Sequence, residues 1–341
     1  MIIGKAARAI VDYVSNLLTA PNELKRLRRD FDHFTATWGS TTGEPPLLAD
    51  EPGAVVCRLV ADTPHPIFNP SLVATGEGTF LGTVRSSNFV KFAETTHVRE
   101  AEVYDVRSHL FRLTADLDCE FIGELDDGAV RHPGSPAENG IEDCRLFRHR
   151  GDIWGVGSAV RQRGRGLPVH PILFRLDGTK IVEHHFGWRT QGFIEKNWTP
   201  VEGRETPTLL RLLSPPDVIE LRDGELVRLS DARPSKEPLL LRGGTPSIPF
   251  GRHHLAVAHL APRKIWGRLH YPHCFVVHDE RLRHVETSEP FYFRRPGLEF
   301  ACGLQIHGGD LFVSYGVADR AAEVMRLPLA ALEKRLVAAR Y

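Results

Sequence analysis

A unit made of a strand, a glycine turn and a second strand recurs five times along this 341-residue chain. The anchor of each unit, at the start of its first strand, stands at position 69, 143, 197, 245 or 302, so the intervals run from 48 to 74 residues. Intervals near fifty leave room for about four short strands per unit, which is typical of a β-propeller blade. A β-sandwich is the competing all-β fold, but it gives no reason for an anchor at the same point of each repeat. The sequence therefore predicts an all-β, five-bladed β-propeller.

Residues 50–330 are predicted to form this propeller, because glycine and proline are frequent there and no long helical pattern occurs. In residues 1–45, apolar residues recur three or four apart and basic residues line the opposite face of the second stretch, which predicts an N-terminal helical extension. We expect this extension to pack on the propeller or on a second subunit of a homo-oligomer; the alternative is contact with an anionic membrane surface. A C-terminal helix is expected over 331–341, where Leu332, Leu336 and Val337 share one face.

Charge and cysteine content argue against several classes of function. The chain carries 43 basic and 43 acidic residues, so it lacks the positive excess that binding to nucleic acid requires. Its five cysteines are scattered and form no CxxC pair, which is typical of reduced thiols in a cytoplasmic protein. The histidines between 253 and 278 lack metal-ligand spacing and no GxSxG elbow occurs, so neither a metal nor a serine nucleophile is expected.

The anchors and the polar residues near them should meet, because the innermost strand of each propeller blade starts close to the central axis. Amides, carboxylates and aromatic rings such as Trp198, Tyr271 and Tyr315 suit a sugar, whereas several cations suit a phosphate group. Each residue alone is typical of a solvated strand end or a turn, and only their coincidence at equivalent places argues for a site. The convergent set is Asn69, Arg85, Glu142, Asp143, Arg145, Lys196, Asn197, Arg242, His259, Tyr271, His273, Glu299 and Asp319.

The stretch Gly140–Phe147 gathers two acids and a cation within four residues. Because residues two apart share a face of a strand, Asp143 and Arg145 are expected to point the same way, with Glu142 on the opposite face against a neighbouring blade. A guanidinium beside a carboxylate in a closed pocket orients the acid and sets its pKa. The alternative is an ordinary surface pair of Asp and Arg at the start of a strand.

The anchor motifs resemble those of glycoside hydrolase family 130, the β-mannoside phosphorylases, and of their mannosyltransferase relatives. The similar motifs are Phe68-Asn69-Pro70 in the first blade, Gly140–Leu146 beside the signature Gly-x-Glu-Asp-Pro-Arg, Lys196 in the third blade, His259 followed by Tyr271 in the fourth, and Tyr315–Asp319 beside Tyr-Gly-x-x-Asp in the last. Cys144 departs from the signature, which has proline there. The resemblance spans residues 65 to 325 and implies a five-bladed propeller that transfers a mannoside-like sugar.

The resemblance also implies roles for the convergent residues, with Asp143 as the general acid. By the resemblance, the phosphate would lie near Arg145, Lys196, His259 and Tyr271, and the sugar near Asn69, Arg85 and Asp319. From the convergent set we also expect Arg242 and His273 at the phosphate, and Glu142, Asn197 and Glu299 at the sugar. Asn69 cannot act as a base, so the nucleophile is expected to be an anion already and the anomeric carbon to be inverted. No cofactor is implied beyond inorganic phosphate, a sugar phosphate or a sugar nucleotide as co-substrate.

Three alternatives to a glycoside phosphorylase or its synthetic reverse remain open. A glycosyltransferase that depends on a sugar nucleotide could hold the diphosphate with Arg161, Arg163 and Arg165. A glycoside hydrolase would need Glu142 or Glu299 as its base. A propeller that only binds glycans would need no catalytic group.

Overall fold

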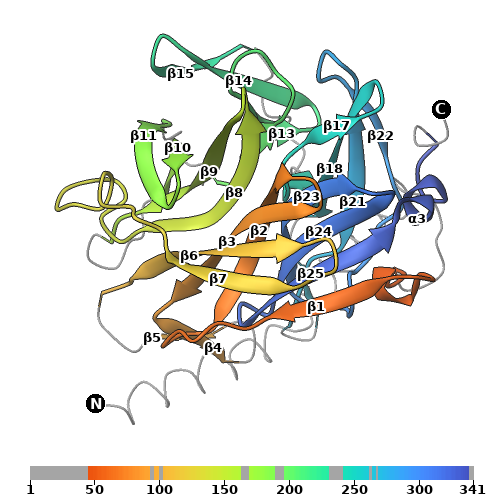
Figure 1. Cartoon of the computed structure of the whole chain (residues 1–341), viewed down its shortest axis with the longest axis horizontal. Helices are drawn as coiled ribbons and strands as arrows, with labels where there is room; N and C mark the ends of the chain where they lie inside the picture. Colours follow the sequence, from red (N-terminus) through yellow and green to blue (C-terminus); the bar gives the residue numbers. More distant parts are fainter. Residues whose placement is uncertain are drawn as a thin grey trace.

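In the described part of the chain, five sheets of four or five strands are arranged around a central axis (Figure 1). The computed structural model describes residues 45–92, 96–99, 103–162, 169–188, 196–229, 241–260, 263–265 and 268–337. The prediction of an all-β, five-bladed propeller is confirmed. The N-terminal helices expected within residues 1–45 fall almost entirely outside the described residues. Within the described part, no helix is long and apolar enough to cross a membrane.

Each of the first four blades is built from strands of one continuous stretch of the chain. Blade 1 contains β2 (Ile67–Gly76), β3 (Thr79–Ser87), β6 (Val106–Thr114) and β7 (Cys119–Glu124), and blade 2 contains β8 (Ile141–His149), β9 (Asp152–Val160), β10 (Val169–Asp177) and β11 (Lys180–Phe186). Blade 3 contains β12 (Thr199–Val201), β13 (Thr208–Leu213), β14 (Pro216–Arg222) and β15 (Glu225–Arg228). Blade 4 contains β16 (Leu241–Gly243), β17 (Ile248–Phe250), β18 (His253–Leu260), β21 (His273–His278) and β22 (His284–Thr287).

Blade 5 joins the two ends of the described chain. Its inner strands are β23 (Glu299–His307), β24 (Asp310–Val317) and β25 (Ala321–Pro328), and its outer strand is β1 (Val55–Leu59), which comes before blade 1 in the sequence. The two strands run antiparallel, with Val55 opposite Arg326 and Leu59 opposite Ala322, and the orange β1 lies beside the blue β25 in Figure 1. The ring is therefore closed by hydrogen bonds between an early and a late strand, which the sequence pattern did not predict.

Burial falls from the axis to the rim of each blade. The inner strand β8 is buried at seven of its nine positions, whereas no residue of the outer strand β7 is fully buried. Close packing between strands explains two glycines at equivalent places: a side chain on Gly82 would overlap the ring of Phe111, and one on Gly155 the ring of Phe174. A short 3-10 helix (Leu48–Asp50) and the C-terminal helix α3 (Leu329–Glu333) pack against blades 4 and 5 through apolar residues such as Leu48 and Leu332.

Two hairpins extend from the blades, the first between β3 and β6 and the second between β18 and β21. The first, β4 (Phe89–Phe92) with β5 (Thr96–Arg99), belongs to blade 1, and the second, β19 (Arg263–Ile265) with β20 (Arg268–His270), belongs to blade 4. Phe89 from the first hairpin and Leu269 from the second line the same cavity. The hairpins therefore lie on the face of the propeller at which the inner strands begin.

Candidate active site

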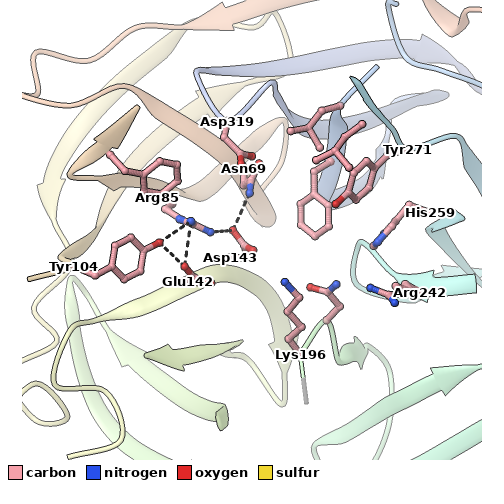
Figure 2. A pocket seen from close by; sticks show the side chains of 15 residues that line it. Asn69, Arg85, Tyr104, Glu142, Asp143, Lys196, Arg242, His259, Tyr271 and Asp319 are labelled. Atoms are coloured by element: carbon pink, nitrogen blue, oxygen red, sulfur yellow. Dashed lines mark hydrogen bonds and ion pairs between the residues drawn. The ribbon is translucent and has the colours of Figure 1, made fainter. Parts of the chain in front are cut away.

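A cavity of about 340 Å³ opens where the inner strands of the blades begin. Figure 2 shows its side chains from close by. All five blades contribute to its lining, which consists of Asn69, Arg85, Phe89, Tyr104, Glu142, Asp143, Lys196, Asn197, Arg242, His259, Leu269, Tyr271, Leu298, Phe300 and Asp319. Ten of the thirteen residues predicted to converge are therefore in the lining, and the other three (Arg145, His273 and Glu299) are not.

An unusual backbone conformation places four of the polar lining residues. Asn69, Asp143, Asn197 and Asp319 have φ angles of 53°, 51°, 64° and 49°. Such left-handed backbone is uncommon outside glycine, and Asn and Asp adopt it most readily. Backbone strain of this kind costs roughly 1–3 kcal/mol per residue and clusters at functional sites. Four residues with this strained backbone around one cavity therefore indicate a functional site, whose geometry lowers the stability of the fold.

Two neighbours fix the carboxylate of Asp143. Nδ2 of Asn69 and Nη1 of Arg85 donate to Oδ1 of Asp143 over 2.8 and 2.7 Å, and only 8% of Asp143 is exposed. Burial alone would raise the pKa of Asp143, but the charge of Arg85, followed by that of Arg145 and the hydrogen bond from Asn69, lowers it below its usual value. Asp143 is therefore an ionised and oriented carboxylate.

Glu142 lies in the cavity beside Asp143, so the prediction that it points away is wrong. The pairing of β8 with β9 shifts register between Glu142 and Arg145, and the left-handed Asp143 lies within this bulge. A bulge interrupts the alternation of side chains along a strand, so neighbouring residues can face the same way. The expected contact with a neighbouring blade is nevertheless made, because Glu142 accepts a 2.5 Å hydrogen bond from the hydroxyl of Tyr104 and pairs with Arg85 at 3.1 Å.

Arg145 lies beneath the cavity and does not touch the carboxylate of Asp143, contrary to the expected pairing. Its guanidinium is 1% exposed and donates to the carbonyl oxygens of Asp143 and Gly244 and to Oδ1 of Asn197. These bonds join the starts of blades 2, 3 and 4. Among the described residues no carboxylate pairs with Arg145, so a buried positive charge remains under the floor of the site.

A second group of polar residues faces Asp143 from blades 3 and 4, on the right of Figure 2. Lys196 and Arg242 are exposed to the cavity, and neither pairs with a carboxylate within the described ranges. His259 is 1% exposed, and its Nδ1 finds no hydrogen-bond partner in the described part of the chain. Burial, then the nearby His273 and Arg242, lower the pKa of His259 well below its usual value, so the ring is neutral. Burial raises the pKa of Tyr271 to about 12, which leaves its hydroxyl protonated and able to donate.

The remaining predicted residues have other surroundings. His273 is completely buried, packs on Phe293 with ring centroids 4.7 Å apart, and accepts a bond from the backbone N–H of Ala301. Glu299 is also completely buried, and its carboxylate faces the backbone of residues 293–295. Trp198 and Tyr315, expected to stack on a sugar ring, are 2% and 0% exposed and do not line the cavity.

Sequence reasoning missed five lining residues: Phe89, Tyr104, Leu269, Leu298 and Phe300. Phe89 and Leu269 lie on the two hairpins, which have no equivalent in the repeat, and Tyr104 lies in the connection that follows the first hairpin. Leu298 and Phe300 flank Glu299, so the correct segment was identified through the wrong side chain. The apolar character of both neighbours of Glu299 was the available signal.

Comparisons with known proteins agree on the fold. No protein-family model matches the sequence, and no curated protein does. A structure from the GH130 family of mannoside phosphorylases, which contains glycoside hydrolases that target β-1,2 mannosidic linkages, is similar with a TM-score of 0.55 and 12% identity over 84% of this chain and 97% of that one. β-1,2-Mannobiose phosphorylase from Listeria innocua has a TM-score of 0.55 and 14% identity, covering 84% and 93%. The GDP-Man-dependent mannosyltransferase MPT-1 from Leishmania mexicana has a TM-score of 0.52 and 12% identity, covering 88% and 93%. Identities this low show a shared propeller fold, of the type that the sequence motifs predicted.

Proposed function

We propose that this protein is a carbohydrate-active enzyme that transfers a mannoside-like glycosyl group with inversion, and that a phosphate group is the nucleophile or the leaving group. One observation carries the proposal. The cavity holds an ionised, oriented carboxylate, Asp143, opposite a wall whose cations, Lys196 and Arg242, have no acidic partner among the described residues. The carboxylate suits proton transfer at a sugar oxygen, and the wall suits an anion.

The ionised state of Asp143 fits the synthetic direction of the reaction most directly. The carboxylate would take the proton from an acceptor hydroxyl while that oxygen attacks the anomeric carbon. The bond from that carbon to the phosphate oxygen would break, and the phosphate would leave with the electron pair. In the reverse reaction the same group must be protonated, so that it can give the proton to the departing sugar oxygen.

An anion bound at the cationic wall would help Asp143 to take up that proton. The charges of Arg85, Arg145 and Lys196 hold its pKa below the usual value. A bound phosphate would offset part of this positive field, and a nearby like charge raises the pKa of a carboxylate. The donor phosphate and the catalytic carboxylate would thus be coupled through the cations between them.

The cationic wall supports the phosphate assignment in a modified form. Lys196 and Arg242 would contact the anion, the hydroxyl of Tyr271 and a ring N–H of His259 would donate hydrogen bonds, and the buried Arg145 would act only through its field. The sugar would lie toward Asn69, Arg85 and Asp319 on the other side of the cavity. Because Glu142 is held by Tyr104 and Arg85, we assign it to the support of that side.

Two alternatives differ in donor or nucleophile. A sugar nucleotide is the second candidate, because a GDP-Man-dependent mannosyltransferase shares the fold and a diphosphate would also suit the cationic wall. Of the three arginines that the sequence suggests for the diphosphate, Arg163 and Arg165 lie outside the described residues, and Arg161 pairs with Glu138. Hydrolysis with Glu299 as the base is disfavoured, because its carboxylate faces loop backbone.

A donor screen tests the proposal. The protein would be incubated with sugar 1-phosphates, with sugar nucleotides, and with β-mannosides plus inorganic phosphate, and the products analysed by NMR. We expect turnover of a sugar 1-phosphate, and phosphorolysis of the product to the opposite anomer. Release of free sugar at a rate independent of phosphate and nucleotide would identify a hydrolase. Glycan binding without turnover of any donor would identify a binding module.

A further inference from the structure

We propose that Glu299 is a positioning residue, which holds the loop 293–298 in the shape that places Tyr271 and Asp319 in the cavity. The proposal concerns how the site is built, and only its kinetic consequences rest on the proposed function. Glu299 stands at the start of β23 between Leu298 and Phe300, both of which line the cavity, while its own carboxylate turns away from it.

The carboxylate of Glu299 binds three consecutive backbone N–H groups of the loop. Oε2 accepts from Phe293 over 2.7 Å, and Oε1 accepts from Arg294 and Arg295 over 3.0 and 3.2 Å. Every one of these partners is a donor, so a carboxylate, which only accepts, matches them all. An amide at this position would offer one accepting oxygen and would turn its NH₂ group toward donors.

The far end of the loop is joined to the cavity by two further backbone bonds. The carbonyl oxygen of Gly297 accepts from the N–H of Tyr271 over 2.9 Å, and that of Leu298 accepts from the N–H of Ala318 over 2.8 Å. Ala318 and Asp319 are two successive left-handed residues, with φ of 54° and 49°. A strained pair of this kind persists only where its surroundings determine it. The loop therefore fixes the backbone at both cavity residues.

Little else holds the middle of the loop in place. Phe293 is anchored by its ring, which stacks on Tyr315 at 4.3 Å, but residues 294–296 are exposed. Arg294 forms an ion pair with Glu323, yet its side chain is 57% exposed, and such pairs contribute little. The internal hold on this segment is the Glu299 carboxylate, whose charge is met by N–H groups. Burial raises the pKa of Glu299 to about 7 because no cation contacts the carboxylate directly, so the ionised form that accepts from all three N–H groups predominates only above about pH 7.

Glu299→Gln, with Glu323→Gln as its matched control, tests the proposal. Glu323 is a buried acid on β25 of the same blade, but it contacts the side chains of Arg294 and Tyr315 and not the loop backbone. Amide hydrogen exchange would be measured without substrate at pH 8, above the pKa of Glu299, so that the wild-type carboxylate is ionised. We expect exchange at the N–H groups of Tyr271 and Ala318 to rise at least tenfold in Glu299→Gln and to stay at the wild-type rate in Glu323→Gln. Amides of blade 2 serve as an internal reference for global unfolding.

Kinetics supply the second measurement. Because no hydrogen bond or ion pair among the described residues joins Asp143, Asn69 or Arg85 to the loop, Glu299→Gln should raise KM about tenfold and lower kcat by less than about threefold. Wild-type exchange rates at both amides in Glu299→Gln would overturn the proposal. Equal acceleration of their exchange in Glu323→Gln would overturn it as well, because it would indicate general loosening of the core. If Glu299→Gln does not fold, Glu299→Asp replaces it: the shorter acid should accelerate exchange at the same two amides, and wild-type rates there would refute the idea. Exchange is read without turnover, so failure of the proposed reaction would not be mistaken for failure of this proposal.

Discussion

Replacing Asp143 with asparagine separates the chemical role of this residue from its structural role. Asparagine has nearly the same shape, adopts the left-handed φ of 51° at least as readily, and keeps an oxygen that can accept from Asn69 or Arg85. Arg85 also keeps its ion pair with Glu142. The loss is therefore the extra strength of a charged hydrogen bond, and we expect the free energy of unfolding to fall by only about 1–2 kcal/mol. Urea denaturation measures this cost.

The effect on turnover should be much larger. An amide neither takes nor gives the proton at the transferred oxygen, and positioned proton transfer contributes about 10²–10⁴ in rate. This corresponds to about 3–5 kcal/mol of activation free energy. The assay compares initial rates of Asp143→Asn and wild type with the donor found in the screen and an unactivated acceptor. In the phosphorolytic direction, an aryl glycoside whose leaving group needs no proton should lose much less activity than an alkyl glycoside.

Asp217→Asn is the matched control for this substitution. Asp217 is likewise buried and bound by two arginines, Arg211 and Arg228, but it lies in blade 3 and does not line the cavity. We expect this variant to lose stability and to keep its activity per folded molecule. A folded Asp143→Asn that retains more than about a tenth of wild-type kcat/KM on an unactivated substrate would refute the proton-transfer role. Equal losses on aryl and alkyl glycosides would refute it as well.

The remaining predictions concern the cationic wall, the packing around Asn69 and the titration of the buried Glu299. Lys196→Met should raise KM for a phosphate-bearing donor at least about tenfold, because it removes one charge-assisted bond. The melting temperature should stay nearly unchanged, since Lys196 is exposed. An unchanged donor KM would show that Lys196 does not belong to the phosphate site. Gly316→Ala should displace Asn69, because the added methyl group would overlap Oδ1 of Asn69. We expect the free energy of unfolding to fall by about 1–3 kcal/mol and turnover to drop as well. Full activity would contradict the packing argument. Burial raises the pKa of Glu299 from 4.5 to about 7, so the folded state binds its proton more tightly than the unfolded state. The stability contributed by this protonation is present below pH 4.5 and lost as pH rises through about 7, and amounts to about 3 kcal/mol at most. The free energy of unfolding of wild type minus that of Glu299→Gln, measured in urea, should therefore fall between pH 4.5 and 8; a difference independent of pH would show that Glu299 titrates normally.

The five repeat units could be predicted because each blade needs the same local signals. An apolar inner strand, a glycine turn and a second strand were read correctly in every blade, from β2 and β3 to β23 and β24. The outer strand of blade 5 could not be found in this way. Strand β1 has no repeat partner beside it in the sequence, and its pairing with β25 depends on the ring having closed. Local pattern carries no information about such a contact.

Errors at the site also have physical causes. Strict alternation along a strand predicted opposite directions for Glu142 and Asp143, but the register shift in β8 brings both into the cavity. Pairing of near neighbours favoured Arg145 as the partner of Asp143, whereas the contact comes from Arg85 in another blade. Spacing identifies which segments converge on the axis. It does not determine which side chains of those segments turn inward, because bulges and left-handed residues decide that locally.

The closure of blade 5 by β1 has a consequence for how the chain is made. Val55 leaves the ribosome about 270 residues before Arg326, with which it pairs, and at 5–20 residues per second this delay is roughly 15–55 s. During that time blades 1 to 4 can assemble from neighbouring strands, while β1 exposes its edge to any other strand it meets. We expect slow completion of the ring, since a contact of such long range forms late. Moving the termini to the connection between β1 and β2 would make every blade continuous in sequence. In such a permuted chain β1 would be synthesised after β25, so the ring should close without the delay and the chain should aggregate less during synthesis.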